Sequence, residues 1–252
     1  MSDLKVYRAP FISLVSRPQF LEPTHLMVKW VGVAGGGERL AEYAGRLCYM
    51  SQHNPVMRTT SDYIGHILEQ GHGSVFEHAN YSFLLEGVSR SLTHELIRHR
   101  AGFAYSQLSQ RYVDASQTGF VLPPAIAGTE GEAAWHQQME MALGTYQELA
   151  AMLEEQYTWV ENRVHRRKMA REAARSVLPN STETKIVVTG NIRAWRTMLE
   201  LRSSEAAELE IRRLAVALIK FFQSEAPAFV QDFTIYTAAD KREAATVEHH
   251  KV

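Results

Sequence analysis

The sequence is poor in several features that would place it in a broad class at once. Its 252 residues include one cysteine, Cys48, so no internal disulfide can form, and the chain fits a reducing compartment. There is no run of about 18 apolar residues, and the N-terminus lacks the basic start and apolar run of a secretory signal. We therefore expect a cytoplasmic protein that does not enter a membrane.

An excess of one charge is also missing, since 27 lysines and arginines balance 28 aspartates and glutamates. General nucleic-acid binders usually carry a basic excess, so this balance argues against one. Neither common glycine-rich nucleotide loop occurs, and nothing indicates a Rossmann or P-loop site. The histidines follow no compact zinc spacing, so we expect no metal site.

One segment, from Arg98 to Tyr112, is rich in hydrogen-bond donors. Its fifteen positions hold three arginines, a histidine, two serines and two glutamines, but no carboxylate. A surface segment of a nearly neutral protein normally mixes both signs, so this one predicts an anion from outside the chain. The arginine fork suits phosphate oxygens, and Ser or Gln can contact a base or sugar. We interpret the segment as nucleotide-binding; an arginine-rich solvated turn is the alternative for an isolated Arg-His-Arg triplet.

Apolar periodicity predicts mixed helix and sheet in a single catalytic domain over residues 1–240, followed by a charged, frayed tail at 241–252. Strands are expected at 4–15 with a break at Pro10, at 80–88 and at 182–188. Helices are expected at 38–50, from a cap at Thr60 or Ser61 to Gly71, at 89–98, 131–160, 163–175, 191–202 and 205–222.

Two of these helices carry rows of cations. The helix capped by Ser89 has Arg90, His94 and Arg98 at spacing four, which is consistent with either a phosphate-facing edge or a solvent-facing row. Arg163, Arg167, Arg171 and Arg175 form a second row, for which Glu172 and nearby acids are the expected counter-charges. Arg175 lies at the end of this row.

Arg98-His99-Arg100, followed by Ser109, Gln110 and Arg111, resembles the signature of the flavin-dependent thymidylate synthase family. Segments 71–78, 174–180 and 190–196 are similar to family segments in the same order, and the resemblance runs from about Phe11 to Thr234. Eight residues, 101–108, precede Ser109 where the family usually has seven. Thr197 and Ala206 stand where many members have histidine.

The resemblance implies an α+β fold, with a small, mainly antiparallel sheet wrapped by helices, in a homotetramer with shared sites. It also implies methylation of uracil C5 in dUMP with FAD, 5,10-methylenetetrahydrofolate and NADPH, and no enzymic cysteine nucleophile. The same chemistry on UMP is an alternative. An RNA-binding module, with Tyr105 or Tyr112 stacking on bases, is a more distant one.

Family positions carry over onto this chain as expected contacts. The nucleotide would contact Arg90, Glu95, Leu96, Ile97, Arg98, Gln107, Leu108, Ser109, Gln110, Arg111, Arg175 and Arg202. FAD would contact Ser74, Arg98, His99, Arg100, Gln107, Asn191, Ile192 and Arg193. Arg202 is the expected catalytic residue, which stabilises negative charge at the pyrimidine N3 edge. His72 would border the folate and nicotinamide. Cys48, on an apolar helix, is expected to be buried and inert.

Overall fold

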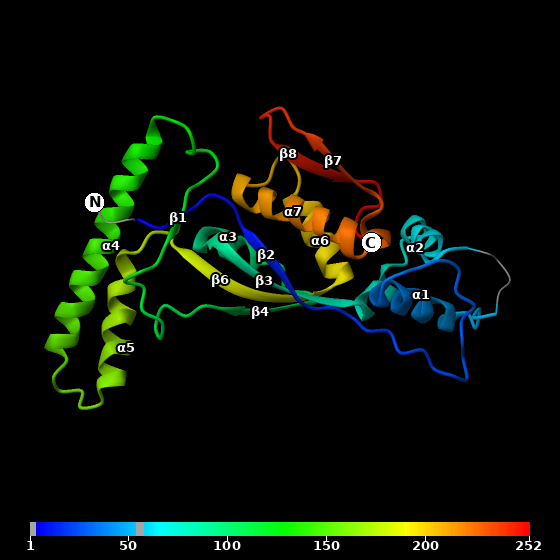
Figure 1. The fold of residues 1–252 in the computed structure, drawn as a ribbon, viewed down its shortest axis with the longest axis horizontal. Helices are drawn as coiled ribbons and strands as arrows, with labels where there is room; N and C mark the ends of the chain where they lie inside the picture. Colours follow the sequence, from blue (N-terminus) through cyan, green and yellow to red (C-terminus); the bar gives the residue numbers. More distant parts are fainter. Residues whose placement is uncertain (1–3, 54–57) are drawn as a thin grey trace. The chain divides into compact units, whose positions relative to one another are not determined.

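The structure, a computed structural model, describes residues 4–53 and 58–252 (Figure 1). The chain divides into two compact units. The first unit contains Met1–Phe11, Leu85–Glu95 and Ser106–Ile186, and the second contains Ile12–Leu84, Leu96–Tyr105 and Val187–Val252. Each unit is built from three separate stretches, so neither is continuous in sequence. That residues 1–240 act as one catalytic domain stays a prediction.

A four-stranded sheet has the strand order β2-β3-β6-β4. Its strands are β2 (Phe11–Ser16), β3 (Asn80–Ser89), β6 (Glu183–Asn191) and β4 (Phe103–Gln107). Burial alternates along much of β3 and β6, because successive side chains point to opposite faces. Mixed helices and a mainly antiparallel sheet confirm the predicted α+β class.

The predicted strands 80–88 and 182–188 are β3 and β6, and the break at Pro10 separates β1 (Val6–Tyr7) from β2. Sequence periodicity missed β4 because it spans five residues within the donor-rich segment. It also missed β5 (Phe120–Val121), which pairs with β1 in parallel. Strands this short carry too few alternating positions to be recognised.

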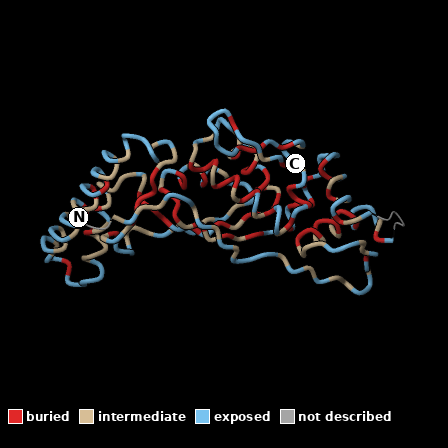
Figure 2. Tube along the Cα trace, turned by 45° about the horizontal axis from the view of Figure 1, so that its top comes forward, coloured by how far each residue is buried: buried red, intermediate tan, exposed pale blue. Residues whose placement is uncertain are grey.

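Aromatic side chains form much of the core of the second unit. Tyr81 and Phe83 on β3 face α6 (Ile192–Arg202) and α7 (Leu209–Glu225). The ring centroids of Phe83 and Trp195 are 5.2 Å apart, and those of Tyr81 and Phe222 are 5.4 Å apart, both in edge-to-face geometry. On α7 the predicted core face is confirmed, since Ile211, Leu214, Leu218 and Phe222 are fully buried. Such residues recur as short red stretches in Figure 2.

Helices α1 (Gly36–Cys48) and α2 (Thr60–Glu69) pack against each other. The cap of α2 is Thr59, whose hydroxyl accepts the amide of Asp62 at 3.1 Å, so the predicted cap at Thr60 or Ser61 is wrong. After α2, residues 73–78 form the 3-10 helix η1 (Gly73–His78).

The buried face of α1 is unexpectedly polar. Apolar spacing predicted the helix correctly, yet the face that is covered carries Glu42 and Arg46, whose side chains form an ion pair at 2.6 Å. Leu47, by contrast, is exposed. Arg46 also donates to the backbone carbonyl of Ser51 at 3.2 Å, and helical spacing alone does not predict such a buried pair.

Two helices dominate the first unit. α4 (Gly131–Gln156) and α5 (Arg163–Ala174) lie side by side (Figure 1). Tyr146 of α4 and Ala174 of α5 enclose Ala115, and the 3-10 helix η2 (Arg175–Val177) follows α5. Among the described residues no helix has both the length and the apolar surface to cross a membrane.

The end of the chain is ordered, contrary to the frayed tail that its charge predicted. After η3 (Pro227–Val230), β7 (Phe233–Thr237) and β8 (Glu243–Val247) form an antiparallel pair. Ala244, Val247 and Val252 are buried. The charged residues of this tail leave short apolar positions between them, and these are buried while Glu243 and Thr246 stay exposed.

Candidate active site

Helix α3 (Arg90–Leu96) leads into the Arg98-His99-Arg100 turn. The predicted cap is confirmed, since the amide of Leu92 donates to the hydroxyl of Ser89 at 2.9 Å. Leu92 and Leu96 are buried on the predicted core face. The helix ends at Leu96, two residues earlier than predicted, and Arg98 therefore belongs to the turn.

Gly102 brings this turn against the start of α6. Its φ angle is +75°, a conformation that side-chain-bearing residues rarely adopt. A Cβ atom there would lie 2.7 Å from Nδ2 of Asn191 and 2.8 Å from Cβ of Ala194. Only glycine therefore permits this approach. It lies within the 101–108 segment that is one residue longer than usual in the family motif.

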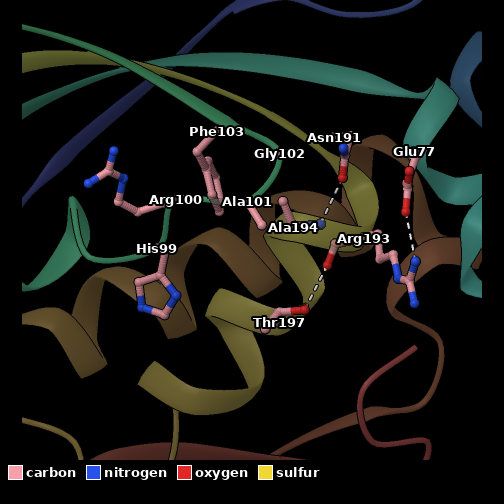
Figure 3. A pocket seen from close by; sticks show the side chains of 10 residues that line it. All are labelled: Glu77, His99, Arg100, Ala101, Gly102, Phe103, Asn191, Arg193, Ala194 and Thr197. Atoms are coloured by element: carbon pink, nitrogen blue, oxygen red, sulfur yellow. Dashed lines mark hydrogen bonds and ion pairs between the residues drawn. The ribbon is translucent and has the colours of Figure 1, made fainter.

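The turn and α6 enclose a hollow of about 440 Å³, here called the turn pocket (Figure 3). It is lined by Glu77, His99, Arg100, Ala101, Gly102, Phe103, Asn191, Arg193, Ala194 and Thr197. Asn191 caps α6 by accepting the amide of Ala194 at 2.8 Å, and the one lining carboxylate, Glu77, accepts from Arg193 at 2.7 Å. Arginines, an amide and a helix N-terminus together suit the phosphates of a dinucleotide.

His99 is hydrogen-bonded to the arginine that ends α6. Nε of Arg202 donates to Nε2 of His99 at 3.0 Å. Burial, followed by the charges of Arg202 and Arg98, lowers the pKa of His99 below its ordinary value of 6.5. The hydroxyl of Tyr105 donates to the backbone carbonyl of His99 at 2.6 Å, and burial raises the pKa of Tyr105 to about 12. The sequence-predicted catalytic and flavin residues Arg202 and His99 are thus in contact.

A second hollow, of about 180 Å³, lies in the first unit and is here called the loop pocket. It is lined by Lys5, Tyr7, Arg90, Leu108, Ser109, Gln110, Val113, Asp114, Ala115, Gln117, Thr118, Gly119, Glu183 and Lys185. Burial and the charge of Arg175 lower the pKa of Arg90. Nη1 of Arg90 is buried and has no hydrogen-bond acceptor within the described part of the chain. A buried guanidinium nitrogen without an acceptor, in the electrostatic field of a second arginine, indicates an anion site.

Ion pairs tie the segment after β4 to α5. Arg171 donates to Asp114 at 2.8 Å, and Nε of Arg111 lies 3.1 Å from a carboxylate oxygen of Glu172. Glu172 and nearby acids were the predicted counter-charges of the arginine row; the structure instead pairs Arg171 with the distant Asp114 and Glu172 with Arg111. Asp114 is far from Arg171 in the sequence, but the fold places the segment after β4 against α5, where the two side chains meet.

Residues 30–228 match the family model described as thymidylate synthase complementing protein. The flavin-dependent thymidylate synthase of Mycobacterium sp. (strain JLS) is 50% identical over 242 residues, which cover 93% of this chain and 94% of that protein. This chain belongs to the flavin-dependent thymidylate synthase family. The family's enzymes are methyltransferases, and the resemblance seen in the motifs is confirmed.

Two further comparisons agree with this membership. The flavin-dependent thymidylate synthase of Mycobacterium tuberculosis (strain ATCC 25618 / H37Rv) is 48% identical over 241 residues, with the same coverage of both chains. A crystal structure of the UMP/dUMP methylase PolB from Streptomyces cacaoi, bound with 5-Br dUMP, aligns with a TM-score of 0.67 at 19% identity. It covers 90% of this chain and 96% of that one, and shows that the fold is shared.

The nucleotide contacts expected for a member of this family belong to segments of both units. Arg90, Glu95, Gln107, Leu108, Ser109, Gln110, Arg111 and Arg175 belong to the first, and Leu96, Ile97, Arg98 and Arg202 to the second. Arg90, Leu108, Ser109 and Gln110 line the loop pocket together. The amide of Gln107 donates to Thr93 and Thr184 at 3.1 and 3.3 Å. The buried side chain of Leu96 leaves only its backbone for a ligand.

Of the expected flavin contacts, His99, Arg100, Asn191 and Arg193 line the turn pocket, and Arg98 is exposed in the same turn. Ile192 is buried, and its amide donates to the carbonyl of Ala79. Ser74 lines a neighbouring hollow of about 310 Å³, which Arg193 shares. The family positions in the second unit thus gather around the start of α6.

Cys48 is exposed, so the expectation of a buried thiol is wrong. It is the last residue of α1, and it lines the hollow shared by His72, Ser74 and Arg193. Among the described residues, no group of three His, Cys, Asp or Glu side chains is placed to hold a metal ion.

Motif reasoning missed three residues that line the two pockets. Glu77 lines the turn pocket and pairs with Arg193, although it stands inside a family-like segment. Glu183 and Lys185 line the loop pocket. Their spacing of two along a strand places both on one face, which is the signal that could have found them.

Proposed function

We propose that this protein methylates C5 of the uracil ring in dUMP, giving dTMP, with FAD as cofactor. 5,10-Methylenetetrahydrofolate would supply the carbon and NADPH the hydride. The observation that carries the proposal is Arg90 in the loop pocket of a member of this family: its guanidinium feels the charge of Arg175, and one buried nitrogen finds no acceptor among the described residues. A nucleotide phosphate supplies the missing acceptors and the counter-charge.

The first unit's residues would bind and orient the nucleotide. Arg90 and Arg175 take the phosphate, while Ser109 and Gln110 reach its sugar and base. Arg111 is held at Glu172 and so keeps the segment after β4 near α5. Because the guanidinium fork is planar and always charged, it fixes both the position and the direction of the phosphate. The other family positions named above complete the binding set in this proposal.

FAD fits the turn pocket by its donor set. Arg100 and Arg193 would face its phosphates, the side-chain amide of Asn191 would donate to the remaining edge, and Phe103 offers an apolar wall. Bound there, the flavin supplies the electrons that turn a transferred methylene into a methyl group. The protein's own task is to hold the reactants, exclude water and stabilise charge.

Arg202 is the proposed catalytic residue. Its guanidinium would stabilise negative charge at the N3 edge of the pyrimidine, a fixed donor aimed at charge that grows in the transition state. The side chain is half-buried, and its Nε–H is donated to His99, which restricts its rotation. Family resemblance further supports a homotetramer in which several subunits share each site.

One assay decides whether the protein prefers the deoxyribose of dUMP or the ribose of UMP. The visible spectrum of the purified protein is recorded, and dUMP or UMP is then supplied with methylenetetrahydrofolate and NADPH before the products are analysed by mass spectrometry. A flavin spectrum with C5-methylated product establishes the reaction, and the faster nucleotide names the substrate. The solved neighbour is described as a methylase of both UMP and dUMP. Preference for UMP would overturn the dUMP proposal.

The RNA-binding alternative makes the opposite forecast. A colourless protein that stays inactive after added FAD, and that binds RNA with a steep salt dependence, would replace the enzyme proposal. Glu172 and Asp114 pair with two of the arginines near the loop, which leaves less positive charge for an RNA backbone.

Arg90→Gln is expected to raise KM for the nucleotide by roughly 10- to 100-fold, because a hydrogen bond to a charged group contributes about 1.5–3 kcal/mol. The melting temperature should not fall, since the variant removes a half-buried guanidinium next to Arg175. Arg163→Gln on exposed α5 is the matched control and should leave KM unchanged. Steady-state kinetics and thermal unfolding measure both. An unchanged KM in Arg90→Gln would contradict phosphate binding at the loop pocket.

Cys48→Ser is expected to retain most of the turnover of the parent protein, because the proposed reaction needs no enzymic thiol. The side chain is exposed and the substitution nearly isosteric, so the fold should tolerate it. Product formation and the flavin spectrum are compared at equal protein concentration. Loss of all activity with an intact fold would restore a thiol mechanism.

A further inference from the structure

The contact between His99 and Arg202 defines the protonation state of the imidazole. An arginine guanidinium has donors only, and here its Nε–H points at Nε2 of His99 over 3.0 Å. Nε2 must therefore carry a lone pair, and the proton of the neutral ring lies on Nδ1. A doubly protonated ring would have no acceptor for Arg202.

The charges around His99 all favour this neutral form. Arg98 and Arg100 flank it in the turn, and Arg202 faces it from α6. From β4, Tyr105 contributes a neutral hydroxyl that contacts the backbone carbonyl. The remaining charged residues of the turn pocket, Glu77 and Arg193, are paired with each other at 2.7 Å.

The hydrogen bond from Nε of Arg202 to His99 restricts the orientation of the whole guanidinium. The guanidinium is planar, so a hydrogen bond to Nε sets the plane in which both terminal nitrogens lie. A donor that stabilises a transition state has to be in place beforehand, and errors near 1 Å cost substantial rate. The neutral imidazole is therefore suited to aim Arg202.

We propose that His99 is a positioning residue that aims the Arg202 guanidinium while neutral, and that protonation of His99 releases Arg202 and slows the reaction. The inference rests on the proposed function of Arg202. It assigns to His99 a role separate from binding flavin. Two residues 103 positions apart in the sequence thus form one unit.

The direction of the pH effect follows from the charges. The pKa of His99 lies below 6.5, so the ring is neutral at pH 7.5 and becomes charged only as the pH falls below 6.5. Protonation then removes the acceptor of Arg202 and adds a fourth positive charge beside Arg98, Arg100 and Arg202. Well below the folded pKa, kcat should fall about tenfold for each pH unit, as for any single essential base.

The test compares the parent protein with His99→Gln and His99→Ala from pH 5 to 8. The glutamine amide oxygen can accept from Arg202 and does not titrate. His99→Gln should lose the acidic decline, and at pH 7.5 its kcat should lie well above that of His99→Ala. His99→Ala should lower kcat about 10- to 100-fold at every pH, because a hydrogen bond to a charged group is lost. The flavin spectrum reports cofactor occupancy in each.

An acidic decline that persists in His99→Gln would overturn the proposal, as would a normal kcat in His99→Ala with flavin bound. A second readout needs no activity: the imidazole ¹⁵N shifts of His99 are titrated in the parent protein and in Arg202→Gln. The pKa of His99 should rise in Arg202→Gln, because a neighbouring cation is removed. An unchanged pKa would contradict the interaction between the two side chains. If the parent protein methylates no nucleotide, the proposed function fails, and this titration still decides whether Arg202 and His99 interact.

Discussion

Arg202→Ala is expected to lower kcat by about 100-fold or more, corresponding to at least ~2.7 kcal/mol of transition-state stabilisation. Removing the guanidinium leaves developing charge at the pyrimidine without its fixed donor, and leaves Nε2 of His99 without its partner. Because the donor matters most in the transition state, KM for the nucleotide should change less than kcat. Single-turnover product formation with saturating nucleotide measures the effect directly.

Arg17→Ala is the matched control for Arg202→Ala. Arg17 lies in the same unit, is mostly exposed and pairs with Glu225 on the surface, where an ion pair contributes little. The turnover of Arg17→Ala should equal that of the parent protein. Near-normal turnover of Arg202→Ala, with flavin still bound, would remove Arg202 from the proposed mechanism.

Arg196→Met is expected to cause the largest loss of stability, about 3–5 kcal/mol, because it breaks a buried ion pair and leaves one charge uncompensated. Arg196 is 2% exposed and donates to both carboxylate oxygens of Asp232 at 2.7 and 2.8 Å. It also donates to the backbone carbonyls of Phe229 at 2.6 Å and Val252 at 3.3 Å. Methionine fills similar space but satisfies none of these acceptors.

The loss should lower the melting temperature by roughly 6–20 °C in a chain of this size. Thermal unfolding followed by circular dichroism, at one fixed protein concentration, measures it. Lys220→Met is the control, since Lys220 pairs with Glu243 on the surface and should cost at most about 1 kcal/mol. A shift in Arg196→Met no larger than in this control would show that the network is not needed.

The contacts of Arg196 also bear on the candidate active site. Arg196 lies in the middle of α6, which begins beside Asn191 and Arg193 and ends at Arg202. Its contacts join that helix to η3 and to the end of the chain. The ordered C-terminus therefore helps to hold the helix on which the proposed flavin and catalytic residues are placed.

Features set by near neighbours could be predicted from the sequence. The Ser89 cap depends on a side chain and an amide three residues apart, and the Asn191 cap has the same spacing. The buried face of α7 follows from apolar residues at intervals of three and four. Family motifs likewise located the turn and α6, because they are short and their order is preserved.

Features that need a distant partner were predicted poorly. The buried ion pair of α1 and the exposure of Cys48 depend on what covers each part of that helix. The pairing of Arg171 with Asp114 joins residues 57 positions apart. The strand β8 was mistaken for a frayed tail because its charges are visible in the sequence, whereas the core that accepts its apolar face is not.

By itself, then, the sequence determined the family, the α+β class, most helices and the chemical types gathered near the turn. These follow from residue identity and from contacts within one or two helical turns. Only the tertiary structure decided that His99 faces Arg202, that a buried nitrogen of Arg90 finds no acceptor among the described residues, and that Arg196 joins α6 to the C-terminus. Burial and charge pairing depend on segments far apart in the chain, and folding alone brings those together.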